Sequence, residues 1–261
     1  MELTIVKVFL PTALAFAIGI LITPTVTHYL YKYKMWKETP GKGRGYGGGG
    51  TPLFDKLHEQ SDTNTPRLGG IVIWGSVLLT IFLIGLLEMW MPDSIFGKLN
   101  FLSRSQTWLP LFALAIGALV GFADDYLTVS GNGKHFAGGL PLSQRLVVVA
   151  VTALFSAWWF YEKLEISSVH LIGYGEVPLG FWFIPFFIIV ALCVYTSSVI
   201  DGLDGLSGGV FMYIFAAYAG IALWQNQIDI AAFCATIVGG ILAFLWFNIP
   251  PARFYMGETG I

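Results

Sequence analysis

Long apolar stretches recur along the whole chain, and each is about as long as a helix that crosses a bilayer. About 20 apolar helical residues cross a hydrocarbon core of about 30 Å. Seven stretches are predicted to span a membrane: residues 5–30, 69–91, 106–123, 144–161, 181–200, 207–224 and 230–247. The first runs too long for a signal peptide and lacks a small-residue cleavage site, so we expect it to remain as a span. The pattern predicts an all-α integral membrane protein, a polytopic helical bundle.

The composition supports this prediction and excludes several other classes. Of 261 residues, 56% are apolar and 11% are charged, whereas soluble domains carry about 25% charged residues. The polar segments are too short to fold separately, so we expect a single membrane domain over residues 1–261. The 14 basic and 16 acidic residues nearly cancel, which argues against a nucleic-acid binder with a basic face.

The distribution of lysine and arginine predicts the orientation. With seven crossings, four polar segments share one side of the membrane: the loops at about 31–68, 124–143 and 201–206 and the tail 248–261. This side carries ten of the 14 basic residues. Because basic residues accumulate on the inner side of membranes, it is predicted to be cytoplasmic, with the N-terminus outside.

Carboxylates stand at the predicted cytoplasmic ends of the spans. Asp124 and Asp125 follow the third span, Asp201 and Asp204 follow the fifth, and Glu258 lies in the tail. Ionisable groups at such positions are costly unless they are paired, hydrated or bound to metal, and two adjacent carboxylates fit a divalent cation such as Mg²⁺. Asp201 or Asp204 could instead cap the following helix. A cation path is a further alternative, although transport sites usually lie at the membrane midplane.

Glycines accompany these acids in the strings DGLDGL and MGETG. Glycine permits positive φ and close approach of the backbone, which suits a bound phosphate and suits a tight turn between helices equally well.

Four stretches in this order resemble one family: TPRLGG (65–70), GFADDYL (121–127), DGLDGLSGG (201–209) and FNIPPARFYMGETG (247–260). The family is that of the polyprenyl-phosphate N-acetylhexosamine-1-phosphate transferases, of the glycosyltransferase family 4 type. Within it, TPRLGG and GLPLSQRL (139–146) resemble the phospho-N-acetylmuramoyl-pentapeptide transferases of peptidoglycan synthesis.

The resemblance implies an Mg²⁺-dependent enzyme at the cytoplasmic face of the bacterial inner membrane. It would transfer phospho-N-acetylmuramoyl-pentapeptide from the UDP-linked precursor to undecaprenyl phosphate, giving lipid I and UMP. Membrane lipids are expected as partners and nucleic acid is not, while a homodimer is left open. The alternatives are a UDP-N-acetylglucosamine:polyprenyl-phosphate transferase, a cation transporter and an inactive lipid-binding fragment.

The resemblance also assigns roles position by position. The expected catalytic residues are Asp124, Asp125 and Asp201. The expected metal ligands are Asp124, Asp125 and Glu258, with Ser198 as a weak fourth. The expected substrate-binding residues are Thr65, Asp201, Gly202, Leu203, Asp204, Asn248, Tyr255 and Gly257, and His58 matches a histidine that precedes the first motif.

Some positions depart from the family pattern. Glu258 stands where the family has aspartate, and Tyr255 stands where phenylalanine is usual, which still permits stacking on uracil. The family's basic residues before Thr65 are absent. Their charge could come from Lys56, Arg67, Lys134 or Arg145, although the first three fit better as ordinary inside-positive residues and Arg145 has the better claim. The family has about ten spans and a late histidine-rich loop, so the sequence is expected to be C-terminally incomplete.

Overall fold

The computed structural model describes residues 2–36, 64–94, 97, 99–102, 105–130, 139–171, 173–196 and 203–260. The chain divides into two compact units, each of which is described by itself. The first unit contains Met1–Gly139 and Ile200–Ile261, and the second contains Leu140–Val199.

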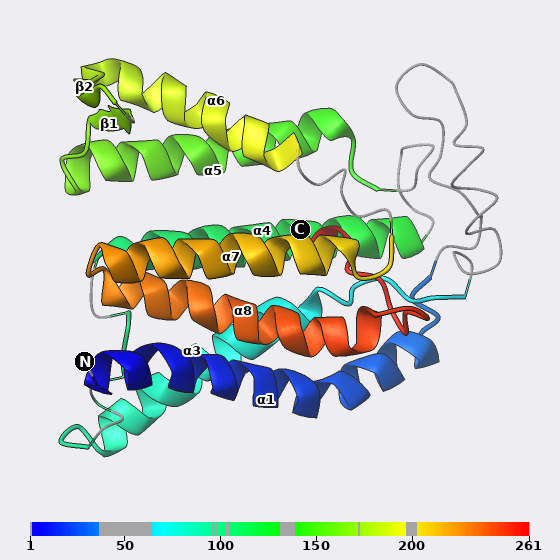
Figure 1. Ribbon diagram of the computed structural model, residues 1–261. Helices are drawn as coiled ribbons and strands as arrows, with labels where there is room; N and C mark the ends of the chain where they lie inside the picture. Colours follow the sequence, from blue (N-terminus) through cyan, green and yellow to red (C-terminus); the bar gives the residue numbers. More distant parts are fainter. Residues whose placement is uncertain are drawn as a thin grey trace. The chain divides into compact units, whose positions relative to one another are not determined.

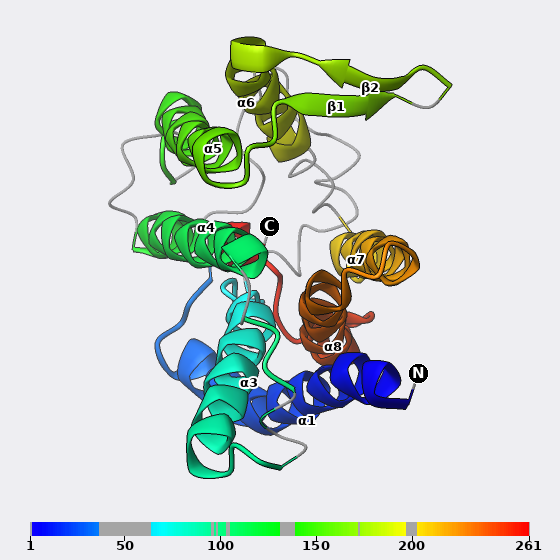
Figure 2. The same cartoon turned by 90° about the vertical axis from the view of Figure 1, so that its left-hand side faces the viewer.

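The first unit is a helical bundle in which α8 occupies the centre (Figures 1 and 2). Its helices are α1 (Glu2–Lys32), α3 (Ile71–Trp90), α4 (Ser105–Val129), α7 (Leu206–Trp224), α8 (Ile228–Asn248) and the short 3₁₀ helix η4 (Glu258–Gly260). α8 packs against α1, α3 and α7, and most of its side chains are buried. η4 packs against α4.

Small residues allow α1, α3 and α8 to pack closely. A Cβ atom at Gly239 would collide with the carbonyl oxygen of Thr12, and one at Gly19 would collide with the Cβ of Ala243. A Cβ atom at Gly240 would lie 2.7 Å from the Ser76 hydroxyl oxygen. Membrane helices gain dispersion contacts where small residues let their backbones approach, so these glycines explain why α8 lies at the centre.

An ion pair joins the start of α1 to the start of α8. Lys7 Nζ lies 2.6 Å from Asp229 Oδ1, and both side chains are mostly buried. By sequence, Lys7 is one of the four basic residues that lie outside the predicted cytoplasmic side. The structure gives it a carboxylate partner on another helix.

We expect Lys7→Met to destabilise the protein by about 3 kcal/mol, because it leaves the Asp229 carboxylate buried without its cation. The double variant Lys7→Met/Asp229→Asn should recover much of this loss, since no buried charge remains. Thermal unfolding in detergent measures both variants. Equal stability of Lys7→Met and the parent protein would contradict this role of the pair.

The second unit consists of two helices joined by a β-hairpin. It contains α5 (Leu142–Lys163), β1 (Ser168–Leu171), β2 (Gly175–Pro178), the 3₁₀ helix η2 (Gly180–Trp182) and α6 (Phe183–Tyr195). α5 packs against α6, and the Phe160 ring on α5 contacts Phe183 and Phe187 on α6, with centroids 6.4 and 5.5 Å apart.

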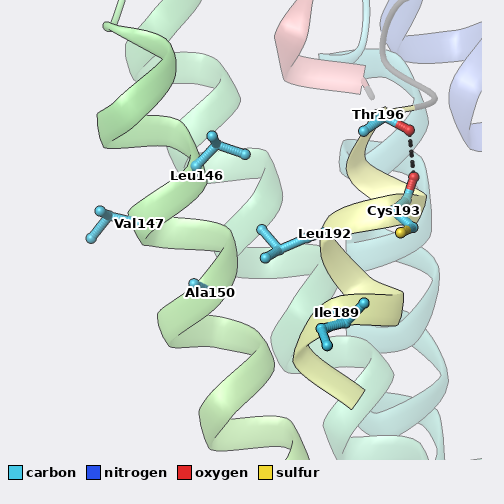
Figure 3. A pocket seen from close by; sticks show the side chains of 7 residues that line it. All are labelled: Leu146, Val147, Ala150, Ile189, Leu192, Cys193 and Thr196. Carbon is cyan, nitrogen blue, oxygen red and sulfur yellow. Dashed lines mark hydrogen bonds between the residues drawn. The ribbon is translucent and has the colours of Figure 1, made fainter. Parts of the chain in front are cut away.

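An apolar groove of about 510 Å³ lies between α5 and α6 (Figure 3). Its lining residues are Leu146, Val147, Ala150, Ile189, Leu192, Cys193 and Thr196. Leu146 and Leu192 point into the space between the helices, and the Thr196 hydroxyl donates to the Cys193 carbonyl at 2.6 Å. The residues that line this groove carry no charged side chain.

Six of the seven predicted spans are confirmed. The helices long and apolar enough to cross a membrane are Thr4–Lys32, Ile71–Trp90, Thr107–Val129, Leu142–Lys163, Leu206–Trp224 and Ile228–Asn248. The predicted span 181–200 contains a shorter apolar helix, Gly180–Tyr195, and residues 197–200 lie outside the described residues. The protein is a polytopic helical membrane protein, while the single domain and the orientation remain predictions.

Two local predictions were wrong. The third span was predicted to end at residue 123, but α4 continues to Val129. The polar residues look like the end of a span, yet the helix continues, and Asp124 and Asp125 are buried within it, with the carboxylate of Asp125 accepting hydrogen bonds from η4. The residues between the predicted spans 144–161 and 181–200 contain the β1–β2 hairpin, although the apolar pattern predicts no strand there.

Candidate functional site

Segments of the first and fourth motifs pair through their backbones. Tyr255 N donates to the Pro66 carbonyl at 2.8 Å, and the carbonyls of Tyr255 and Met256 accept from the amides of Gly69 and Gly70, both at 2.9 Å. The Phe254 ring is buried beside this pairing, with its centroid 5.8 Å from that of Phe244 on α8. The segment after α8 is therefore fixed against the start of α3.

Glycines let the same segment approach α4. A Cβ atom at Gly121 would collide with the Glu258 carbonyl oxygen, and one at Gly70 would collide with the backbone of Gly260. Gly257 has φ +70°, and a Cβ atom there would collide with the Asp125 carboxylate. Three of the four motifs thus meet at η4, and in the structure these glycines serve backbone packing.

Asp125 lies at the centre of this meeting point. Its side chain is on α4 and the residue is 1% exposed. Its Oδ2 accepts hydrogen bonds from Thr259 N at 2.8 Å and from Thr259 Oγ1 at 2.5 Å. The Glu258 backbone and the positive charge of Arg67 also act on this carboxylate. Its Oδ1 is buried, and no donor in the described part of the chain reaches it.

Asp124 is buried as well, but it faces a different segment. A Cβ atom at Gly139 would lie 2.8 and 2.9 Å from the two Asp124 carboxylate oxygens. Successive helical residues point about 100° apart, so Asp124 faces Gly139 while Asp125 faces Thr259. Within the described ranges, no three Asp, Glu, His or Cys side chains form a group that could hold a metal ion. The set Asp124, Asp125 and Glu258 therefore does not form a complete cage by itself.

Asn248 connects the third motif to the fourth. Its Oδ1 accepts from Gly205 N at 2.9 Å, and its Nδ2 donates to the Phe254 carbonyl at 2.8 Å. Asp204 Oδ2 accepts from Ala252 N at 3.3 Å. Asn248 is buried and thus holds the start of α7 against the segment after α8, and its expected role in substrate binding remains a prediction.

The capping alternative for Asp204 is wrong. The residue at the N-cap of α7 is Gly205, with φ +77° and no side-chain cap. The Asp204 carboxylate reaches across to Ala252 instead. Because the chain needs a left-handed turn immediately before α7, glycine takes the capping position.

We expect Asn248→Leu to destabilise the protein by about 2–4 kcal/mol, because Gly205 N and the Phe254 carbonyl both lose a buried partner. Asn248→Asp should also destabilise the protein, because it keeps the acceptor for Gly205 N but buries a carboxylate against the Phe254 carbonyl. Thermal unfolding measures both variants, and parent-like stability of Asn248→Leu would contradict this role.

The other predicted site residues lie in different surroundings. Thr65, Tyr255 and Glu258 are half-buried in the first unit, and Leu203 is exposed before α7. Arg145 belongs to the second unit, where its Nε donates to the Leu140 carbonyl at 3.2 Å. Six residues named from the sequence lie outside the described residues: Lys56, His58, Lys134, Ser198, Asp201 and Gly202.

Two residues gain importance from the structure. Thr259 was not singled out, although it stands between Glu258 and Gly260 in a motif that already drew attention. Arg67 was one of several basic residues without an assigned partner. The structure brings both to Asp125, and only the pairing of segments far apart in the chain reveals this.

Comparisons with known proteins identify the family of the chain. Residues 107–261 match the model of glycosyl transferase family 4. The phospho-N-acetylmuramoyl-pentapeptide-transferase of Listeria monocytogenes is 34% identical over 254 residues, which cover 95% of this chain and 69% of that protein. The enzyme of the same name from Anoxybacillus flavithermus is 32% identical over 258 residues, covering 97% of this chain and 71% of that protein. The chain therefore belongs to glycosyl transferase family 4.

Proposed function

We propose that this protein transfers phospho-N-acetylmuramoyl-pentapeptide from its UDP-linked precursor to undecaprenyl phosphate, giving lipid I and UMP. One observation carries the proposal: motif segments more than 130 residues apart meet at the buried Asp125, in a chain 34% identical over 95% of its length to a protein of this name. The substrate is inferred from the name of that relative, and the site is inferred from the contacts around Asp125.

The reaction forms one phosphorus–oxygen bond and breaks another. An oxygen of the lipid phosphate attacks the phosphorus attached to the sugar, and UMP leaves with the electrons of the broken diphosphate bond. Both reactants are anionic, so charge repulsion and positioning make up much of the barrier. The positive charge of Arg67 acts electrostatically on the Asp125 carboxylate, and Thr259 fixes the orientation of the carboxylate.

Asp125 fits Mg²⁺ as a partial site. Its Oδ1 is buried without a partner in the described chain, and Mg²⁺ commonly takes one or two protein carboxylates together with substrate phosphates. Asp125 would hold the ion together with substrate phosphates, because Asp124 faces Gly139 instead. When bound, Mg²⁺ would neutralise the charge of the diphosphate.

The site end of the first unit would face the cytoplasm of a bacterium, in its inner membrane. The C-terminal ends of α1, α4 and α8 lie at the same end of this unit as the start of α3 (Figure 1). This is the side on which the sequence places ten of the 14 basic residues, and such loops attract a nucleotide diphosphate.

UMP release from purified membranes tests the proposal. We expect release from UDP-N-acetylmuramoyl-pentapeptide that requires both undecaprenyl phosphate and Mg²⁺. Release from UDP-N-acetylglucosamine alone would favour the alternative donor. The absence of release with both donors would overturn the assignment as a transferase.

Thr259 is expected to act as a positioning residue through Asp125. Thr259→Val should lower kcat by about 10–100-fold, as is typical when a partner that orients a functional carboxylate is removed, with little change in KM. Thr259→Ser should restore the rate because it keeps the hydroxyl donor. A structural role alone would predict lower stability in both variants and no rescue of kcat by serine.

A further inference from the structure

The β1–β2 hairpin of the second unit has one apolar and one polar face. The strands pair antiparallel, with Val169 opposite Val177 and His170 opposite Glu176. Since alternate residues of a strand point to opposite faces, Leu171 shares a face with Val169 and Val177. On the other face, the Ser168 hydroxyl donates to Glu176 Oε2 at 2.6 Å.

Hydrogen bonds join the base of the hairpin to α5 and to the start of η2. Ile166 N donates to the Phe160 carbonyl on α5 at 3.0 Å, and the Ser167 carbonyl accepts from Leu179 N at 2.9 Å and from Gly180 N at 3.1 Å. α5 ends at Lys163 and β1 begins at Ser168, so a short connection separates the hairpin from a membrane-spanning helix. The depth of α5 in the bilayer therefore places the hairpin close to the membrane surface.

Large apolar side chains around the hairpin are exposed. Tyr174 at the turn is 88% exposed, Trp182 at the end of η2 is 74% exposed, and Leu171 is 48% exposed. A hairpin of only two strands is marginally stable in water, and tyrosine and tryptophan concentrate at the boundary between membrane and water. Exposed aromatic side chains beside a spanning helix match the chemistry of that boundary.

We propose that the β1–β2 hairpin lies in the membrane interface, with its apolar face against the lipid acyl chains and its polar face toward water. The partner that its apolar face contacts is the lipid surface next to the end of α5. Leu171 enters the acyl region, Tyr174 and Trp182 lie at the level of the headgroups, and His170 and Glu176 remain in water. This inference is independent of the proposed transferase reaction.

The test compares two neighbouring residues on opposite faces. Leu171→Cys and His170→Cys are made in a Cys193→Ser background, because Cys193 is exposed and Cys234 is buried. Each variant is labelled with the environment-sensitive fluorophore NBD and placed in phosphatidylcholine nanodiscs. We expect severalfold brighter emission at position 171, quenched by lipids brominated near the headgroup. Emission at position 170 should be quenched by iodide in the aqueous phase.

Three outcomes would overturn the proposal. Equal quenching of both positions by iodide would place the hairpin in water, and equal protection of both from iodide and brominated lipid would indicate a protein cover. Lipid quenching at position 170 rather than 171 would reverse the faces. Tyr174→Cys, labelled in the same way, gives a second measurement at the turn. Because Tyr174 is exposed in the folded chain, this substitution should not disturb folding.

Discussion

Replacing Asp125 with asparagine will reduce UMP release by about 10²–10³-fold. Asparagine preserves the side-chain shape and can still accept from Thr259 N and Thr259 Oγ1, but it removes the negative charge. Loss of a charge that holds a cation against the diphosphate should cost about 3–4 kcal/mol of transition-state stabilisation, at about 1.4 kcal/mol for each tenfold loss of rate. Initial rates under saturating substrates measure the effect.

Asp93→Asn is the matched control, because Asp93 is exposed in the loop after α3 and should retain the parent rate. Thermal unfolding of both variants separates lost chemistry from lost folding. If Asp125→Asn proved as active as the parent protein, Asp125 would have no part in the transfer step and no role toward Mg²⁺.

Replacing Gly257 with alanine will disrupt the contact between η4 and α4. The added Cβ would collide with the Asp125 carboxylate, and the positive φ costs a residue with a side chain about 1–2 kcal/mol before any collision. We expect a destabilisation of at least about 2 kcal/mol and a loss of UMP release comparable to that of Asp125→Asn, because Thr259 moves with the segment. Thermal unfolding and initial rates measure the two effects.

The matched control is Gly117→Ala on α4, one turn before Gly121. A Cβ atom there meets nothing within 4 Å, so alanine should keep the rate and raise stability by up to about 1 kcal/mol through its helix propensity. Equal behaviour of Gly257→Ala and Gly117→Ala would show that the close approach of η4 to Asp125 is unimportant.

The apolar pattern predicted most of the fold because each span is a continuous run whose length follows from the thickness of the bilayer. It failed at the end of α4, where a polar pair normally marks the end of a span. Asp124 and Asp125 stay helical and buried because Gly139 and η4 come back against them. Those partners lie elsewhere in the chain, so local hydropathy could not predict them.

The acidic residues of the candidate site could be predicted from the sequence. The contacts that these residues make could be predicted less well. Asp125 was named from the adjacent carboxylates alone. Thr259 donates two hydrogen bonds to the Asp125 carboxylate, but nothing in the sequence around it predicts this role beyond its place in MGETG. Asn248 was assigned to substrate binding, yet its amide oxygen and nitrogen bond to Gly205 and Phe254. The residue types in the sequence indicate which chemistry is available. Contacts between segments far apart in the chain decide which side chain is placed to carry it out.

A double-mutant cycle between Asp125 and Thr259 tests the central claim most directly. The claim is that Thr259 serves transfer through the Asp125 carboxylate. UMP release is measured for the parent, Asp125→Asn, Thr259→Val and the double variant. If both residues act through one contact, the double variant loses no more activity than Asp125→Asn alone. Losses that simply multiply would show that the two residues act independently and would contradict the account.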